Sequence, residues 1–278
     1  MAQDAREITG HYVLVEGTRI YYEECGRGIP LVCVHTAGAC SLEWYDFLII
    51  MAGNGFRAIA IDLPGHGKSF PVGWQPFRNM RDYADFTWKI VKAVCAGEKP
   101  VITGSSLGGN MVTDIACHHS HSLRATVILE GGAHNPMPMA SDLFADLEDP
   151  HACPGWQSRI ERGVLSGCHY PMAENTSPVE LRWLHRYAPQ QIQVGDLLAF
   201  GRHDVRDKLK DVRCPVLVFK GEADHFIPDS MLDEVVAGIP DGLAEKRVGR
   251  RMGHYPMTER PEALAEIFMD FFRRRGIV

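Results

Sequence analysis

The chain has 278 residues and a mass of 31.0 kDa, enough for one large domain with a well-buried core. Apolar residues make up 45% and charged residues 23%, as in ordinary globular chains, which argues against a disordered or collagen-like protein. The formal net charge of −6 provides no basic excess for binding nucleic acid or an anionic membrane surface.

The eight cysteines are scattered along the chain and include no Cys-x-x-Cys pair. In a chain of this length, such cysteines are typical of reduced thiols in a cytosolic protein. The N-terminus lacks the charged start and apolar run of a secretory signal, and no apolar run approaches the roughly 18 residues that span a bilayer. These observations predict a cytoplasmic protein that is not inserted in a membrane.

The first 130 residues alternate between strand and helix patterns. Gly17-Thr18 separates two short runs typical of strands and predicts a hairpin. Ser41 is placed to cap a helix over about 42–52, which Gly53 and Gly55 would end. Further helices are expected over 82–96 and 107–118, and strands over 12–16, 19–23, 31–34, 57–61, 101–104 and 124–130.

The alternation stops at Gly131. From there to about Lys208 the chain is rich in Pro, His, Trp and Met, and fragments such as 179–187 have a helical pattern. We therefore interpret 131–208 as a helical lid inserted into a core domain made of 1–130 and 209–278. In this second part of the core, strands are expected over 216–220 and 244–248, and helices over 230–236 and 262–275.

Strands that alternate with helices predict an α/β fold, with a mostly parallel sheet covered by helices on both faces. The carboxyl ends of parallel strands meet at one edge of such a sheet, and reactive groups gather there. Polar residues that directly follow an expected strand are therefore the first candidates for a site.

The segment Gly104-Ser105-Ser106-Leu107-Gly108 matches the pattern G-x-S-x-G. It follows an expected buried strand and opens an expected helix, which is the setting of a nucleophile elbow. Glycines leave room at the sharp turn, and the helix N-terminus supplies positive potential where anionic charge develops. Because only Ser106 is centred between two glycines, we predict that Ser106 is the nucleophile.

A serine hydroxyl needs a base, and His254 is the best placed of the thirteen histidines. It lies in the loop between the last expected strand and the last helix. Asp224 follows the preceding strand and is the predicted acid that orients the imidazole. Glu222, two residues away, and Glu130, at the end of the strand after the elbow, are the alternative acids.

The oxyanion formed by nucleophilic attack requires two fixed N–H donors. The backbone of Leu107, directly after the nucleophile, is one predicted donor. The second is expected from the loop after strand 31–34, where small residues let the backbone approach a substrate. We predict Ala37 for this role, with Thr36 as the alternative.

No cofactor or metal is expected. Gly67-Lys68-Ser69 resembles the end of a phosphate-binding loop, but the first glycine of that pattern is replaced by Asp62, and no G-x-G-x-x-G is present. The histidines at 118, 119 and 121 lack the convergent spacing of a zinc site.

Taken together, these motifs resemble the α/β-hydrolase-fold superfamily along nearly the whole chain. The resemblance rests on residues 35–38, on the loop Asp-Leu-Pro-Gly-His-Gly-Lys-Ser at 62–69, on the elbow, and on the acid and histidine loops. Thr36 departs from the family pattern, which has a glycine after the histidine of the oxyanion loop. The resemblance implies an eight-stranded, mostly parallel sheet, a serine nucleophile in place of aspartate, the chain order Ser-Asp-His, and a helical cap over the site.

The expected function is cleavage of a carboxylic ester or lactone through an acyl-enzyme, where the preference for esters follows from the resemblance alone. Carbon–carbon bond hydrolysis or a lyase reaction on the same fold is the alternative, and a receptor without turnover is a third hypothesis. The expected partner is a small molecule with an apolar or aromatic part, and the sequence leaves the oligomeric state open. The residues of the lid expected to bind this molecule are Trp156, Met172, Trp183 and Tyr187.

Overall fold

The computed structural model describes residues 7–136, 156–168 and 177–278. Its centre is an eight-stranded sheet with the order β1-β2-β4-β3-β5-β6-β7-β8. The strands are β1 (Thr9–Val15), β2 (Thr18–Gly26), β3 (Ile29–Val34), β4 (Phe56–Ile61), β5 (Val101–Ser105), β6 (Ala125–Leu129), β7 (Val216–Gly221) and β8 (Ala244–Gly249). The predicted α/β fold with an eight-stranded, mostly parallel sheet is therefore confirmed.

Two antiparallel strands at one edge lead into a parallel sheet. The predicted hairpin forms β1 and β2, which pair antiparallel, and β2 pairs antiparallel with β4. From β4 to β8 all neighbouring strands are parallel. The carboxyl ends of β3, β5, β6, β7 and β8 therefore lie at the same edge of the sheet, which is where the candidate site is found.

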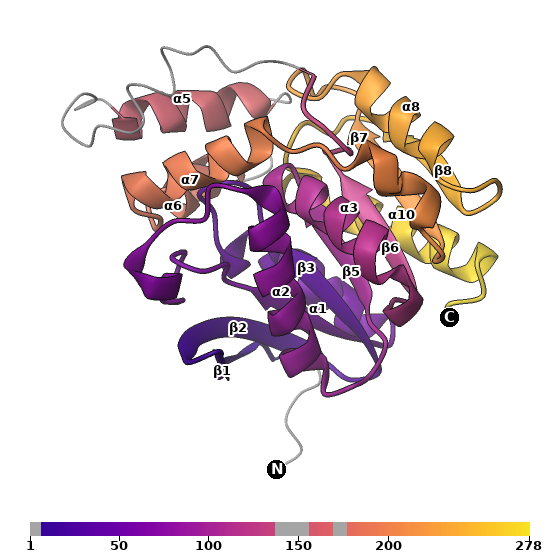
Figure 1. Ribbon diagram of the computed structural model, residues 1–278, viewed down its shortest axis with the longest axis horizontal. Coiled ribbons are helices and arrows are strands. Elements are labelled where there is room, and N and C mark those ends of the chain that lie inside the picture. The colour runs from indigo at the N-terminus through magenta and orange to yellow at the C-terminus, as the bar shows by residue number, and fades with distance from the viewer. Residues whose placement is uncertain (1–6, 137–155, 169–176) are drawn as a thin grey trace.

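Helices cover both faces of the sheet, and each face has its own apolar core (Figure 1). One face packs against α2 (Met80–Cys95), α3 (Leu107–His119) and α8 (Asp229–Gly238). The other face packs against α1 (Tyr45–Gly53) and α10 (Pro261–Arg274). The single turn α9 (Pro256–Glu259) directly precedes α10 and lies on the same face. Short 3₁₀ turns are η1 (Ser41–Trp44), η2 (Val72–Trp74), η3 (Ser120–Ser122) and η4 (Arg206–Asp211).

The prediction that Ser41 caps a helix starting at Leu42 is wrong. Residues 41–44 form the 3₁₀ turn η1, and α1 begins at Tyr45. Ser41 lies inside that turn, and its backbone N–H donates to Asp62 Oδ1 at 2.7 Å. At a regular helix start, a capping side chain nearby in the sequence accepts such an N–H group. Here the acceptor is instead a tertiary partner from the loop after β4. At α2, by contrast, Asn79 is a local cap, since its side chain accepts from Arg81 N and Asp82 N.

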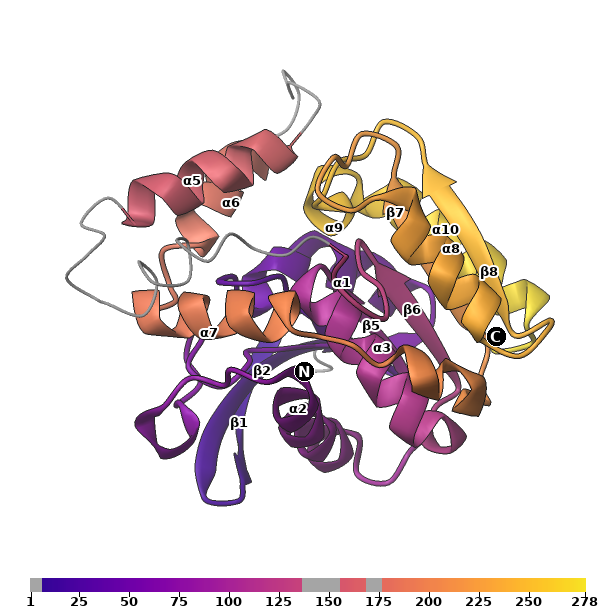
Figure 2. The same cartoon turned by 45° about the horizontal axis from the view of Figure 1, so that its top comes forward.

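Three described helices lie between β6 and β7 in the chain: α5 (Trp156–Gly167), α6 (Ser177–Leu184) and α7 (Gln190–Gly201). We call them the inserted helices. They form a separate layer beyond the carboxyl ends of the strands, with α7 nearest the core (Figure 2). Their position agrees with the predicted lid, whose boundaries of 131 and 208 remain a prediction. Within the described ranges, no helix is long and apolar enough to cross a bilayer.

The aromatic core between α1 and α10 yields a stability prediction. Phe268 is fully buried, and its ring packs edge-on against Phe47 and Phe272 with centroids 5.1 and 5.7 Å apart. Phe268→Ala leaves a cavity there, and we expect it to lower the free energy of unfolding by about 3–5 kcal/mol. Chemical denaturation measures this loss. Phe70, which is 46% exposed, is the matched control, and Phe70→Ala is expected to change stability by less than about 0.5 kcal/mol. Equal losses in the two variants would contradict the packing described here.

Candidate active site

Ser106 occupies a strained turn between β5 and α3. Its backbone has φ 56° and ψ −114°, a conformation that side-chain-bearing residues rarely adopt. Two glycines make the turn possible: a Cβ on Gly104 would lie 2.3 Å from the Gly108 carbonyl oxygen, and one on Gly108 would lie 2.5 Å from the Val34 oxygen. The chain therefore leaves β5 and enters α3 in direct contact with the end of β3. Leu107, the first residue of α3, is fully buried, and its N–H belongs to the first turn, where no helical carbonyl accepts it.

Asp224 and His254 follow β7 and β8, and both side chains are buried. His254 Nδ1 lies 2.8 Å from Asp224 Oδ2, and the Phe226 N–H donates to Asp224 Oδ1 at 2.7 Å. Burial acts to raise the pKa of Asp224, but His254 and the hydrogen bonds outweigh it and hold that pKa below its ordinary value. An ionised Asp224 accepts the Nδ1 proton, which leaves His254 Nε2 as the basic nitrogen of the ring.

Glu130, one alternative acid, is a neighbour of Asp224, and the carboxylate that pairs with His254 is that of Asp224. Its Oε1 accepts the Gly221 N–H at 2.6 Å, and its backbone has a φ of 47°. Burial, together with the neighbouring Asp224 carboxylate, raises the pKa of Glu130 well above its ordinary value. The other alternative, Glu222, accepts the N–H of Arg251.

Within the described residues, one group of three possible metal ligands comes together, and it consists of Glu130, Asp224 and His254. One ligand atom from each lies within 4.8 Å of the other two. A cation here would take the Asp224 and His254 atoms that already share a proton. The donor set therefore fits a hydrogen-bonded carboxylate–imidazole pair better than a metal centre.

Two buried carboxylates hold the loop that follows β3. The N–H and hydroxyl of Thr36 donate to Glu43 at 2.8 and 2.6 Å. The N–H of Gly38 donates to Asp196 Oδ2 at 2.9 Å. Ala37 lies between these two fixed amides and lines the same cavity as Ser106. Because the Thr36 N–H already donates to Glu43, it is not free to bind an oxyanion. Ala37 therefore stays the predicted oxyanion donor of this loop, ahead of the alternative Thr36.

Asp196 also connects the inserted helices to the core. It lies on α7, and its Oδ2 is 2.8 Å from Nε2 of His66, with both side chains almost completely buried. Burial acts to lower the pKa of His66, but the Asp196 carboxylate outweighs it, so the pKa of His66 lies above its ordinary value. The pair is a buried contact that ties α7 to both the loop of His66 and the loop of Ala37.

Ser106 and His254 open onto one cavity of about 320 Å³ beneath the inserted helices. Its wall is mostly apolar and includes a few polar side chains. The lining residues are Thr36, Ala37, Ser106, Asn135, Ile160, Gly163, Val164, His185, Gln193, Leu197, Phe200, Phe226, Ile227, His254 and Tyr255.

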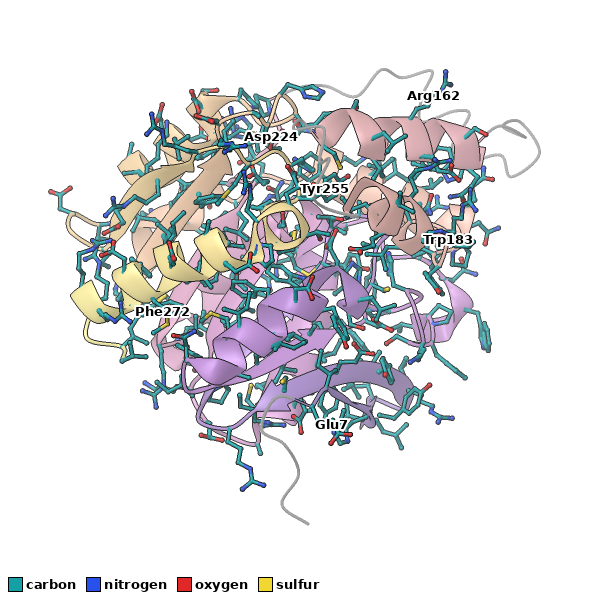
Figure 3. All side chains as sticks on the ribbon, turned by 180° about the vertical axis from the view of Figure 1, so that it is seen from behind. Glu7, Arg162, Trp183, Asp224, Tyr255 and Phe272 are labelled. Carbon is teal, nitrogen blue, oxygen red and sulfur yellow. The ribbon has the colours of Figure 1, made fainter. Side chains whose placement is uncertain are left out.

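Of the lid residues that were predicted to bind substrate, the three that the structure describes do not line this cavity. Trp156 is buried within the inserted helices, where its indole N–H donates to Gln193 at 2.6 Å. Trp183 and Tyr187 are more than half exposed and border a second hollow beside Tyr45. Figure 3 shows Trp183 well apart from Asp224 and Tyr255. Met172 lies outside the described residues.

The sequence analysis did not identify three residues of the candidate site: Glu43 and Asp196, which hold the loop of Ala37, and His185, which lines the cavity. A usable signal existed for Asp196, because it is the single charged residue in the otherwise uncharged stretch of α7. Glu43 and His185 carry no comparable signal, because each resembles an ordinary polar residue of a short helical segment.

The Asp196–His66 pair yields a titration prediction. Asp196→Asn removes the carboxylate that does most to raise the pKa of His66 and leaves burial opposed only by the Pro64 carbonyl and Asp62, so this pKa is expected to fall. In the wild type, the pair stabilises the fold below about pH 6.5 and loses this contribution as pH rises through the folded-state pKa. We expect the variant to lose about 3 kcal/mol near pH 6 and less in mildly alkaline solution.

Imidazole NMR titration and denaturation at the two pH values measure both effects. The exposed residue Asp207 provides a control, and Asp207→Asn is expected to change neither result. An unaltered His66 titration in Asp196→Asn would refute the pairing.

Comparison with known proteins agrees with this architecture. The sequence profile of the alpha/beta hydrolase family matches residues 31–267. A 2-hydroxy-6-oxononadienedioate/2-hydroxy-6-oxononatrienedioate hydrolase from Paraburkholderia phymatum is 27% identical over 277 residues, 93% of each chain. A bifunctional esterase/perhydrolase from Acinetobacter calcoaceticus is 25% identical over 79% of this chain and 83% of its own. The enol-lactonase structure from Burkholderia xenovorans superposes with a TM-score of 0.79 at 16% identity, covering 95% of this chain and 100% of that one. The chain belongs to the alpha/beta hydrolase family.

Proposed function

We propose that this family member is a cofactor-free serine hydrolase that cleaves a carboxylic ester or lactone. The observation that best supports the proposal is that Ser106 and His254 line one cavity while Asp224 holds the far nitrogen of the imidazole at 2.8 Å. This is the relation that a nucleophile, a base and an orienting acid require.

In the proposed mechanism, Ser106 Oγ attacks the carbonyl carbon as His254 Nε2 takes the hydroxyl proton. The tetrahedral intermediate then expels the alkoxide, which receives that proton from His254, and an acyl-enzyme remains. Water attacks the acyl carbon with His254 again as the base, and Ser106 leaves with the proton. Asp224 stays ionised throughout and stabilises the imidazolium, as its lowered pKa requires.

The oxyanion donors in this proposal are the backbone N–H groups of Leu107 and Ala37. Glu43 and Asp196 take the amides on either side of Ala37, which leaves the middle amide beside the cavity. This arrangement accounts for the threonine where relatives of this fold have glycine. The Thr36 hydroxyl gives Glu43 a second hydrogen bond, and so helps to fix the loop.

Carbon–carbon bond hydrolysis is the second candidate, because relatives named for a dienedioate substrate match more than nine tenths of the chain. The substrate in that name carries two carboxylates. None of the described residues that line the cavity is Lys or Arg, so none of them offers a permanent positive charge to bind a carboxylate. This favours the ester or lactone for the present chain.

We also propose that the protein works in the cytoplasm on a small-molecule substrate, with the inserted helices as the cap of its site. The seven described cysteines are free thiols, in line with a reducing compartment. The cap is supported by the contribution of α5 and α7 to the wall of the cavity.

The first test removes the nucleophile. Ser106→Ala is expected to lower kcat on a short p-nitrophenyl ester by about 10⁴–10⁶ while thermal unfolding shows an intact fold. The same comparison on lactones and vinylogous diketones separates the two candidate reactions by their kcat/KM. A fluorophosphonate probe is expected to label the wild type and not the variant. Labelling without turnover of any substrate would instead favour a receptor.

The second test separates the two buried acids. Asp224→Asn is expected to lower kcat about 10⁴-fold, because the imidazole loses its tautomer and its charge partner. Glu130→Gln replaces the acid by an amide of similar shape and leaves the contact between Asp224 and His254 in place, so it is expected to cost much less. Both are measured on the ester that the wild type turns over fastest. A greater loss in Glu130→Gln would show that the acid is misassigned.

A further inference from the structure

The described wall of the cavity beside Ser106 has little positive charge, and this bears on what the cavity binds. None of its described lining residues is Lys or Arg. Three arginines of the inserted helices whose side chains are described lie elsewhere: Arg182 and Arg186 are exposed and both bond Glu161, and Arg162 points away from the molecule (Figure 3). Residues 137–155 and 169–176, which lie outside the described part, contain no Lys or Arg in their sequence.

The cavity wall holds a buried polar side chain that the proposed mechanism leaves unused and whose acceptor nitrogen is unpaired among the described residues. His185, just after α6, is only 2% exposed. Its Nδ1 lies 2.7 Å from the Leu181 carbonyl oxygen, which can only accept, so Nδ1 carries the proton. Nε2 is then a hydrogen-bond acceptor, and no described residue donates to it. Burial lowers the pKa of His185 to about 4, so the ring is uncharged at neutral pH.

We propose that this cavity takes an uncharged, mainly apolar acyl group with one hydroxyl or N–H that donates to His185 Nε2, and that it rejects carboxylates. The proposal rests on the proposed ester or lactone hydrolysis at Ser106 and names the substrate class of that site.

The two parts of the proposal have one physical origin. A carboxylate placed against Ile160, Leu197 and Phe226 would lose its water without gaining a cation, and neutral His185 offers it only a lone pair. A hydroxyl loses its water too, but recovers a hydrogen bond when it donates to that lone pair. The edge-on contact of His185 with Tyr255, at a centroid distance of 5.8 Å, holds the ring beside the loop of His254. His185 is thus placed to determine specificity without taking part in bond cleavage.

The test uses methyl esters of acids with about six to eight carbons, whose far end is a methyl, a hydroxyl or a carboxylate group. For the wild-type protein, we expect kcat/KM for the carboxylate series to be at least about 100-fold below that for the methyl series. The hydroxyl series is expected to stay within about tenfold of the methyl series at its best chain length. Acid release in a pH-stat gives all three values.

Variants of His185 isolate its role. His185→Phe keeps a ring of similar size without an acceptor, and we expect it to lower the hydroxyl-to-methyl ratio of kcat/KM about tenfold. His185→Gln, whose amide oxygen can accept, is expected to restore most of that ratio. The exposed residue His121 is the control, and His121→Ala is expected to leave the ratio unchanged.

The possible results separate this inference from the proposed function. If no ester is cleaved, or cleavage persists in Ser106→Ala, the hydrolytic mechanism itself fails. If cleavage depends on Ser106 but carboxylate esters are cleaved as well as the methyl series, only the substrate class is overturned. A hydroxyl-to-methyl ratio that is the same in His185→Phe and the wild type would likewise overturn the role of His185.

Discussion

The hydrogen bond between His254 and Asp224 is the contact on which the proposed chemistry depends, because it decides which imidazole nitrogen is basic. Its geometry requires that β7 and β8 end side by side, and parallel pairing of these strands provides this. The loop around His254 is held from two further sides. Glu259 accepts the N–H groups of Gly253 and Tyr255, each at 3.0 Å, and the His254 N–H donates to the Gly167 oxygen at 3.1 Å.

The inserted helices therefore do more than cover the proposed site, because they also hold two of its loops. Gly167, at the end of α5, holds the backbone of His254, and Asp196 on α7 holds the amide beside Ala37. His185 contributes to the wall between them. Displacement of these helices would release the base loop and the oxyanion loop together. Substrate entry that moves the cap would consequently couple binding to the assembly of the site.

Local patterns in the sequence sufficed for the sheet, the hairpin and the serine turn, because each depends on short-range periodicity and on glycines at fixed offsets. The rule that reactive groups follow parallel strands also led to Asp224 and His254, which the structure brings within hydrogen-bond distance. The failures have a common cause in tertiary contacts. The Ser41 amide bonds Asp62, a partner 21 residues away, and so a predicted cap became part of a 3₁₀ turn.

The pocket residues were misjudged for a related reason. Composition identifies large aromatic side chains, but it does not show which face of a short helix meets the core. Trp183 on the eight-residue α6 faces outward, while α5 and α7 contribute residues such as Val164 and Leu197 to the cavity wall. Glu43 could not be found from its neighbours in sequence, because its function appears only when the loop of Thr36 folds against η1.

The way this protein holds its buried acids explains why a site rich in carboxylates can adjoin a cavity whose described lining contains no Lys or Arg. Glu43, Glu130, Asp196 and Glu259 each accept at least one backbone N–H, and none of these contacts involves Lys or Arg. Hydrogen bonds from amides fix a carboxyl group while adding no net charge to the site. A positive side chain in the same place would pair with these acids or attract an anionic substrate. Organising the loops through amides and histidines avoids both outcomes, so the proposed specificity for uncharged substrates and the rigidity of the proposed oxyanion loop have the same structural basis.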